Sequence, residues 1–129
     1  MTNIETIPLV YSCSGCSNVA QLANRIAVEL NRSGSAQMSC IAGVGGDVKP
    51  LVNKAKNAQV IIGIDGCPLA CVKNCLARHQ LKADHYFELS SNGYKKRYNQ
   101  SCDEDEFESA LQWITQSIKK SEHHIPLSE

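Results

Sequence analysis

The stretch Val60-Ile61-Ile62-Gly63-Ile64-Asp65-Gly66-Cys67-Pro68 decides the fold that we expect for this chain. Residues 60–64 are a short apolar run rich in β-branched side chains, which is typical of a strand buried on both faces. Asp65-Gly66-Cys67 predicts a tight turn, and Pro68 suits the first position of a helix that the pattern extends to about Leu81. The stretch therefore predicts a strand that leads directly into a helix.

The same order of strand and helix recurs along the chain. Periodicity predicts further strands and helices, the strands at 7–11, 37–41 and 85–89 and the helices at 18–31, about 47–58 and about 103–121. Alternating strands and helices with short connections are typical of α/β proteins with a parallel sheet. We therefore expect an α/β three-layer sandwich with a mainly parallel four-stranded sheet, flavodoxin-like or minimal Rossmann-like in its strand order.

Two connecting segments are predicted to be loops. The first contains Gly43, Gly45 and Gly46 and joins the strand at 37–41 to the next helix. The second, 92–101, contains the basic run Lys95-Lys96-Arg97, which we expect to be solvated, as charge runs in glycine-containing loops usually are.

Length and charge restrict the class of protein. A chain of 129 residues is expected to form a single domain over 1–129. Lys and Arg number 13, as do Asp and Glu, so the formal net charge is zero and electrostatic binding to nucleic acid is disfavoured. The apolar runs span only a few residues, too few to cross a membrane. We expect neither nucleic acid nor a membrane among the partners.

Seven cysteines stand out in this composition. The segment Met1–Thr6 has neither the basic nor the apolar region of a secretory signal, which favours a cytoplasmic location. In a reducing compartment, clustered cysteines bind metal or perform thiol chemistry more often than they form disulfides.

Three of the cysteines repeat with the strand–helix unit. Cys13, Cys40 and Cys67 are each 27 residues apart and lie at or near the ends of predicted strands. If the first strand lies between the other two, adjacent strands place these positions about 5 Å apart along one edge. That edge, at the carboxyl ends of parallel strands, is where such sheets bind ligands.

Other cysteines flank these three. Cys16 forms a Cys-x-x-Cys pair with Cys13, whereas Cys71 and Cys75 follow Cys67 at steps of four along one helix face. Cys71 in the first turn of the helix can reach the edge of the sheet. For Cys75, one turn further on, the sequence favours neither a metal ligand nor a residue of the apolar core.

Two residues beyond this cluster are expected to have other roles. We expect His79 to be a structural histidine and Cys102 an isolated thiol. If a metal is bound at the exposed carboxyl edge of the sheet and Cys102 is a free thiol, either feature allows a homo-oligomer, and the sequence leaves its formation open.

Three segments in this order resemble the DGC-domain family, named for its central Asp-Gly-Cys motif. They are Cys13-Ser-Gly-Cys-Ser-Asn-Val-Ala-Gln-Leu-Ala-Asn, Cys40-Ile-Ala-Gly-Val-Gly-Gly and Ile64-Asp65-Gly66-Cys67-Pro68-Leu69-Ala70-Cys71. The resemblance covers about residues 7–90 and leaves the last helix outside. It implies one zinc ion bound by four cysteines, which by position are Cys13, Cys40, Cys67 and Cys71. Cys16 and Cys75 are additional candidate ligands, and Asp65 and Gly66 belong to the motif.

Alternatives to zinc remain. An iron–sulfur cluster would use the same ligands, although the cysteine spacing matches neither ferredoxin pattern. A thiol-redox or sulfur-transfer protein would use Cys13 and Cys16 as nucleophile and resolving thiol. The sequence leaves open whether the chain is an enzyme, and whether a bound metal is structural, catalytic, carried or sensed.

Overall fold

The computed structural model describes residues 7–123, so the segment Met1–Thr6 considered above as a secretory signal lies outside them. Its sheet consists of parallel strands in the order β2-β1-β3-β4, with bounds β1 (Leu9–Ser12), β2 (Gln37–Met38), β3 (Ile61–Asp65) and β4 (His85–Glu88). The parallel four-stranded sheet confirms the expected fold class. Its order is that of a flavodoxin-like sheet without the fifth strand.

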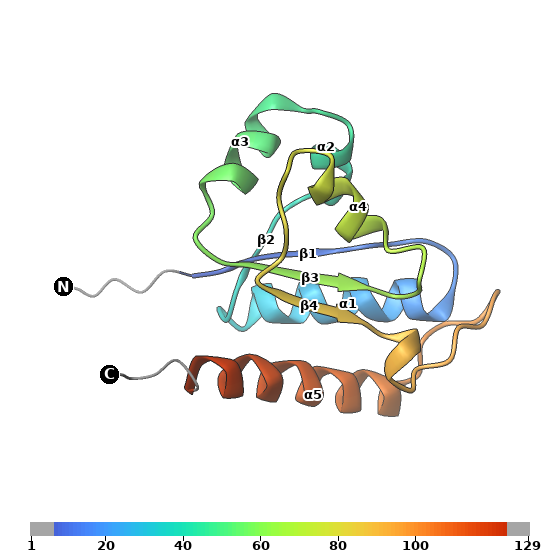
Figure 1. Ribbon diagram of the computed structural model, residues 1–129. Coiled ribbons are helices and arrows are strands. Elements are labelled where there is room, and N and C mark those ends of the chain that lie inside the picture. The colour runs from blue at the N-terminus through green and yellow to red at the C-terminus, as the bar shows by residue number, and fades with distance from the viewer. Residues whose placement is uncertain (1–6, 124–129) are drawn as a thin grey trace.

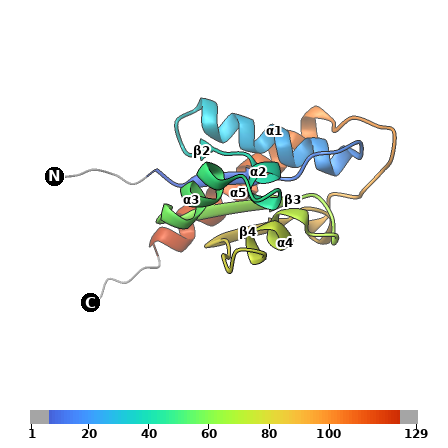
Figure 2. The same cartoon turned by 90° about the horizontal axis from the view of Figure 1, so that it is seen from above.

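Helices cover both faces of the sheet. Within residues 7–123 they are α1 (Asn18–Arg32), α2 (Ile41–Gly45), α3 (Lys49–Asn57), α4 (Cys71–Ala77) and α5 (Glu104–His123), with a 3₁₀ turn, η1 (Ser90–Asn92), after β4. Figure 1 shows α1 and α5 below the sheet and α2, α3 and α4 above it, which gives the expected three layers. Figure 2, turned by 90°, shows the connection from η1 to α5 passing the same end of the molecule as the turn from β1 to α1.

The core lies between the central strands and their helices. Val10 and Ile64 are fully buried in β1 and β3, and Ile26 of α1 packs in the same apolar cluster. Phe107 and Ile114 of α5 are buried as well. Burial of each such side chain contributes about 1.5–3 kcal/mol. This core fixes the ends of β1 and β3, and it is built from apolar side chains.

Three local predictions differ from the structure. The helix expected from Pro68 to about Leu81 begins at Cys71, because Ala70 adopts the left-handed conformation (φ 52°), and it ends at Ala77. The segment expected to be a glycine loop contains the short helix α2. The strand expected at 37–41 is correspondingly shorter, because the chain leaves β2 after Met38 and Cys40 already precedes the first turn of α2.

Candidate thiol site

Four cysteines line one small pocket where the chain leaves β1 and β3. The pocket has a volume of about 170 Å³, and its lining includes Cys13, Cys16, Cys67 and Cys71. At this edge the chain continues from β1 to α1 and from the neighbouring strand β3 to α4. Ligand sites of open α/β sheets usually lie at such an edge. The structure therefore brings together four of the six cysteines that were considered as ligands.

Cys13 forms the buried side of this pocket. It follows β1 directly, and its Sγ accepts a hydrogen bond from the backbone N–H of Gly66, with 3.2 Å between the two atoms. Burial raises the pKa of the Cys13 thiol to about 11, and the hydrogen bond from Gly66 only partly opposes this effect. In the metal-free protein Cys13 is therefore a neutral thiol near pH 7.

Gly66 is required here because two backbones meet. A Cβ atom at this position would lie 2.7 Å from the carbonyl carbon and oxygen of Val19 and 2.9 Å from the amide nitrogen of Ala20. These atoms belong to the first turn of α1, so any larger residue would push α1 away from the end of β3. The close approach holds the segment after β3 against the segment after β1, and with it the thiols of the pocket.

Asp65, the acidic residue of the motif, anchors α4. Its carboxylate is fully buried and accepts hydrogen bonds from the N–H of Val72 (2.8 Å), the N–H of Lys73 (3.1 Å) and the hydroxyl of Tyr86 (2.7 Å). The residue that precedes α4, Ala70, has no side chain that could cap the helix, so Asp65 supplies the cap from the end of β3. Burial and the nearby carboxylate raise the pKa of Tyr86. The anchor fixes Cys71, the first residue of α4.

A lysine from a distant segment also contacts the pocket. Lys96 lines it, and the ammonium Nζ lies 3.4 Å from the Sγ of Cys67. Leu69 and Tyr98 line the same pocket with exposed fractions of 69% and 65%. Lys96, in the basic run that was expected to be solvated, is partly exposed and also makes this contact with Cys67. A separation of 29 residues between Lys96 and Cys67 leaves no local signal in the sequence.

The remaining candidate residues lie elsewhere. Cys40 is exposed at the start of α2 and is not part of the pocket lining. Cys75 packs against α2, since a Cβ atom on Gly45 would lie 2.7 Å from its Sγ, and burial raises the pKa of this thiol. The Nε2 of His79 lies 2.8 Å from the carbonyl oxygen of Val44, in keeping with the structural role expected for it.

The donor set of the pocket fits zinc in its chemistry. Structural zinc sites are commonly built from four thiolates. Within residues 7–123, however, no three Cys, His, Asp or Glu side chains are placed so that they could hold one ion as they stand. Cys16 and Cys71 are exposed and Cys67 is partly exposed, so packing restricts these three side chains less than it restricts the buried Cys13.

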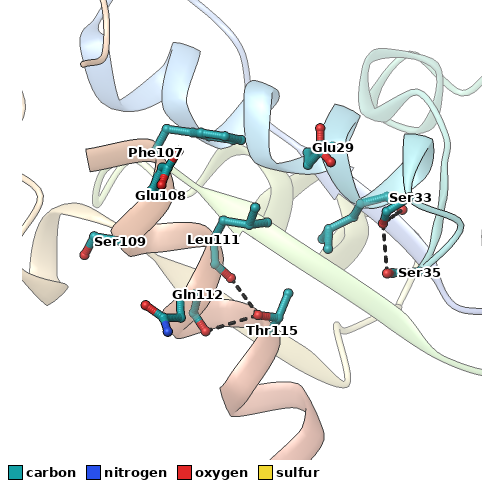
Figure 3. Close-up of a pocket in the computed structure, with 10 residues that line it drawn as sticks. Glu29, Ser33, Ser35, Phe107, Glu108, Ser109, Leu111, Gln112 and Thr115 are labelled. Carbon is teal, nitrogen blue, oxygen red and sulfur yellow. Dashed lines mark hydrogen bonds between the residues drawn. The ribbon is translucent and has the colours of Figure 1, made fainter. Parts of the chain in front are cut away.

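A wider groove lies away from the cysteines. Its volume is about 650 Å³, and it runs between α1 and α5, with Glu29, Phe107 and Thr115 in its lining (Figure 3). The hydroxyl of Thr115 is bonded to carbonyl oxygens of its own helix, at Leu111 and Gln112. The lining of this groove contains neither cysteine nor histidine.

No helix in the described part of the chain combines the length and the apolar composition needed to span a membrane.

A thiol-lined pocket at the carboxyl edge of a small parallel sheet defines a cysteine-rich α/β domain. The sequence model of the DGC domain matches residues 9–114, and the chain belongs to the DGC-domain family. The match continues beyond residue 90 into α5, farther than the three motifs indicated. A relative from Pseudomonas aeruginosa, named anaerobic and virulence modulator AnvM, is 55% identical over 104 residues, which are 81% of this chain and 79% of the relative. No solved structure matches the chain.

Proposed function

We propose that this DGC-domain protein binds one zinc ion through thiolates of the pocket, with Cys13, Cys16, Cys67 and Cys71 as the ligands. The observation that carries the proposal is that four thiols, from the segments that follow β1 and β3, line a single pocket of about 170 Å³. The family resemblance implied Cys40 as a ligand in place of Cys16. We favour Cys16 because it lines this pocket, whereas Cys40 lies outside its lining.

The surroundings of the pocket suit a thiolate site. Four thiolates around a divalent ion leave two excess negative charges, which need nearby donors or cations. The N–H of Gly66 is directed at Cys13, and the ammonium of Lys96 lies beside Cys67. A closed shell of four thiolates leaves no open position on the metal for a substrate.

The metal in this proposal is carried or sensed and is not a requirement for folding. Of the four pocket thiols only Cys13 belongs to the apolar core, which otherwise consists of aliphatic and aromatic side chains. The thiols are also not arranged in advance around one point, in contrast to what a closed structural site would need. The relative is named a modulator. We propose for this chain a regulatory role that depends on whether zinc is bound.

The test is the zinc content of cysteine variants. Protein is purified without oxygen and with a reductant, and metals per chain are measured by mass spectrometry. We expect about one zinc in the wild type, in Cys102→Ser and in Cys40→Ser, and strongly reduced zinc in Cys67→Ser and Cys71→Ser. Circular dichroism of each variant shows whether it is folded.

The series separates the alternatives. Loss of zinc in Cys40→Ser with retention in Cys16→Ser would replace Cys16 by Cys40 as the fourth ligand. Several irons per chain would indicate a cluster. Full zinc in Cys67→Ser, or absence of metal from fresh reduced wild-type protein, would contradict the proposal and favour thiol chemistry instead.

A further inference from the structure

Asn18 is a buried polar residue that the fold uses to hold a distant segment. It is the first residue of α1 and is fully buried. Its Nδ2 donates to the carbonyl oxygen of Lys95 (2.9 Å), its Oδ1 accepts from the N–H of Arg97, and its own N–H donates to the carbonyl oxygen of Arg97 (3.0 Å). One residue thus satisfies backbone groups on both sides of Lys96.

A second anchor holds the same segment from α5. The guanidinium of Arg97 pairs with Glu106 at 3.2 Å and donates to the side chain of Gln100 at 2.6 Å. Figure 2 shows this connection extending past the end of α1 before it returns to α5. The backbone around Lys96 is therefore fixed between two helices, although the segment itself is neither helix nor strand.

The bonds made by Asn18 and Arg97 hold the backbone on both sides of Lys96, and thereby determine where the Lys96 side chain lies. Its Nζ is 3.4 Å from the Sγ of Cys67 and 5.0 Å from the ring centroid of Tyr98. In the part of the chain that the structure describes, Lys96 forms no ion pair with a carboxylate. The ammonium therefore has two neighbours, the side chain of Tyr98 and the sulfur of Cys67. A positive charge at this distance stabilises negative charge on the sulfur.

We propose that Lys96 is the charge partner of the thiolates in the zinc-bound site, and that Asn18 is the positioning residue that places Lys96 there. The inference rests on the proposed function. Residues that hydrogen-bond to metal ligands adjust the affinity of a site without contacting the metal. Lys96 would act in this way by offsetting the negative charge of the zinc–thiolate group, and Asn18 would act through Lys96.

The test compares zinc affinities by competition with a coloured chelator. Loss of an outer-shell partner typically lowers metal affinity by about 10–100-fold, which is the decrease expected for Lys96→Met. Lys96→Arg keeps the charge and should restore most of the affinity. Lys54→Met is the matched control, because it removes one positive charge from an exposed position of α3. Loading with Co²⁺ adds a spectroscopic readout, since the sulfur-to-cobalt absorption should shift in Lys96→Met and stay unchanged in Lys54→Met.

Asn18 is tested in a double-mutant cycle. Asn18→Asp keeps the size of the side chain but cannot donate to the carbonyl of Lys95, so we expect it to weaken zinc binding as Lys96→Met does. If Asn18 acts through Lys96, the double variant binds zinc no more weakly than Lys96→Met alone. A purely structural role of Asn18 would instead give additive losses.

The outcomes distinguish the two proposals. Wild-type protein that binds no zinc overturns the proposed function and this inference with it. Wild-type protein that binds zinc, with an unchanged affinity in Lys96→Met, overturns only the role of Lys96. Additive losses in the double variant overturn only the positioning role of Asn18.

Discussion

The backbone N–H of Gly66 donates a hydrogen bond to the sulfur of Cys13, with 3.2 Å between the nitrogen and Sγ. The contact joins the residue after β3 to the residue after β1, so the central motif and the first cysteine motif of the chain meet directly. It depends on α1, whose first turn packs against Gly66 with no room for a side chain. The geometry of the thiol site is thus set by backbone packing.

Replacing Gly66 with alanine tests this packing. The added Cβ would lie 2.7 Å from backbone atoms of Val19, so α1 or the end of β3 must shift. We expect a loss of about 1–3 kcal/mol in the free energy of unfolding, as for other overpacked sites, together with weaker zinc binding. Urea unfolding and zinc competition measure the two effects.

The matched control for that variant is Gly34→Ala. A Cβ there meets no atom within 4 Å, and only the left-handed backbone (φ +83°) opposes the substitution. It should cost about 1–2 kcal/mol and leave zinc affinity unchanged. Wild-type zinc affinity and wild-type stability in Gly66→Ala would contradict the packing argument.

Asp65→Asn should destabilise the fold. The amide cannot accept all the hydrogen bonds that the carboxylate takes from Val72, Lys73 and Tyr86. Because these bonds are buried and involve a charged acceptor, we expect a loss of about 1.5–3 kcal/mol in the free energy of unfolding. Tyr86→Phe removes only one donor and should cost less. Equal unfolding midpoints for Asp65→Asn and the wild type would show that the carboxylate does not anchor α4.

Cys13 makes the stability of the metal-free protein fall in alkaline solution. Folding raises the pKa of this thiol from its ordinary 9.0 to about 11, so between these values the folded chain holds a proton that the unfolded chain has lost. The contribution of Cys13 to the free energy of unfolding is therefore constant below about pH 9 and decreases by about 1.4 kcal/mol per pH unit as the pH rises toward 11. Urea unfolding of the wild type and of Cys13→Ala across this range isolates the effect. The alkaline decrease should be smaller in Cys13→Ala, and identical slopes would rule out a buried neutral thiol.

The parts of the fold that could be predicted are those with local signals. Burial could be predicted from the apolar run at 60–64 and from the apolar stripe of α1. The structure contains both the strand and the helix. The start of α4 could not be read in this way. Pro68 suits the first turn of a helix, yet the helix begins three residues later, where the cap comes from Asp65 in the preceding strand.

The candidate site was predicted in part for a similar reason. Cys13, Cys67 and Cys71 line one pocket because they follow the neighbouring strands β1 and β3. The alternating pattern predicts parallel strands, and the structure adds that β1 and β3 are adjacent. Cys40 is placed differently because β2 is only two residues long. The contact between Lys96 and Cys67 depends on a hydrogen bond from Asn18 to a residue 77 positions away, which no periodicity or local motif encodes.

X-ray absorption at the zinc edge of the purified, reduced protein tests the central claim most directly. A single zinc held by pocket thiolates predicts a first shell of four sulfur atoms at about 2.3 Å. A first shell dominated by nitrogen or oxygen at about 2.0–2.2 Å, or a protein that retains no zinc, would contradict a thiolate site in this pocket.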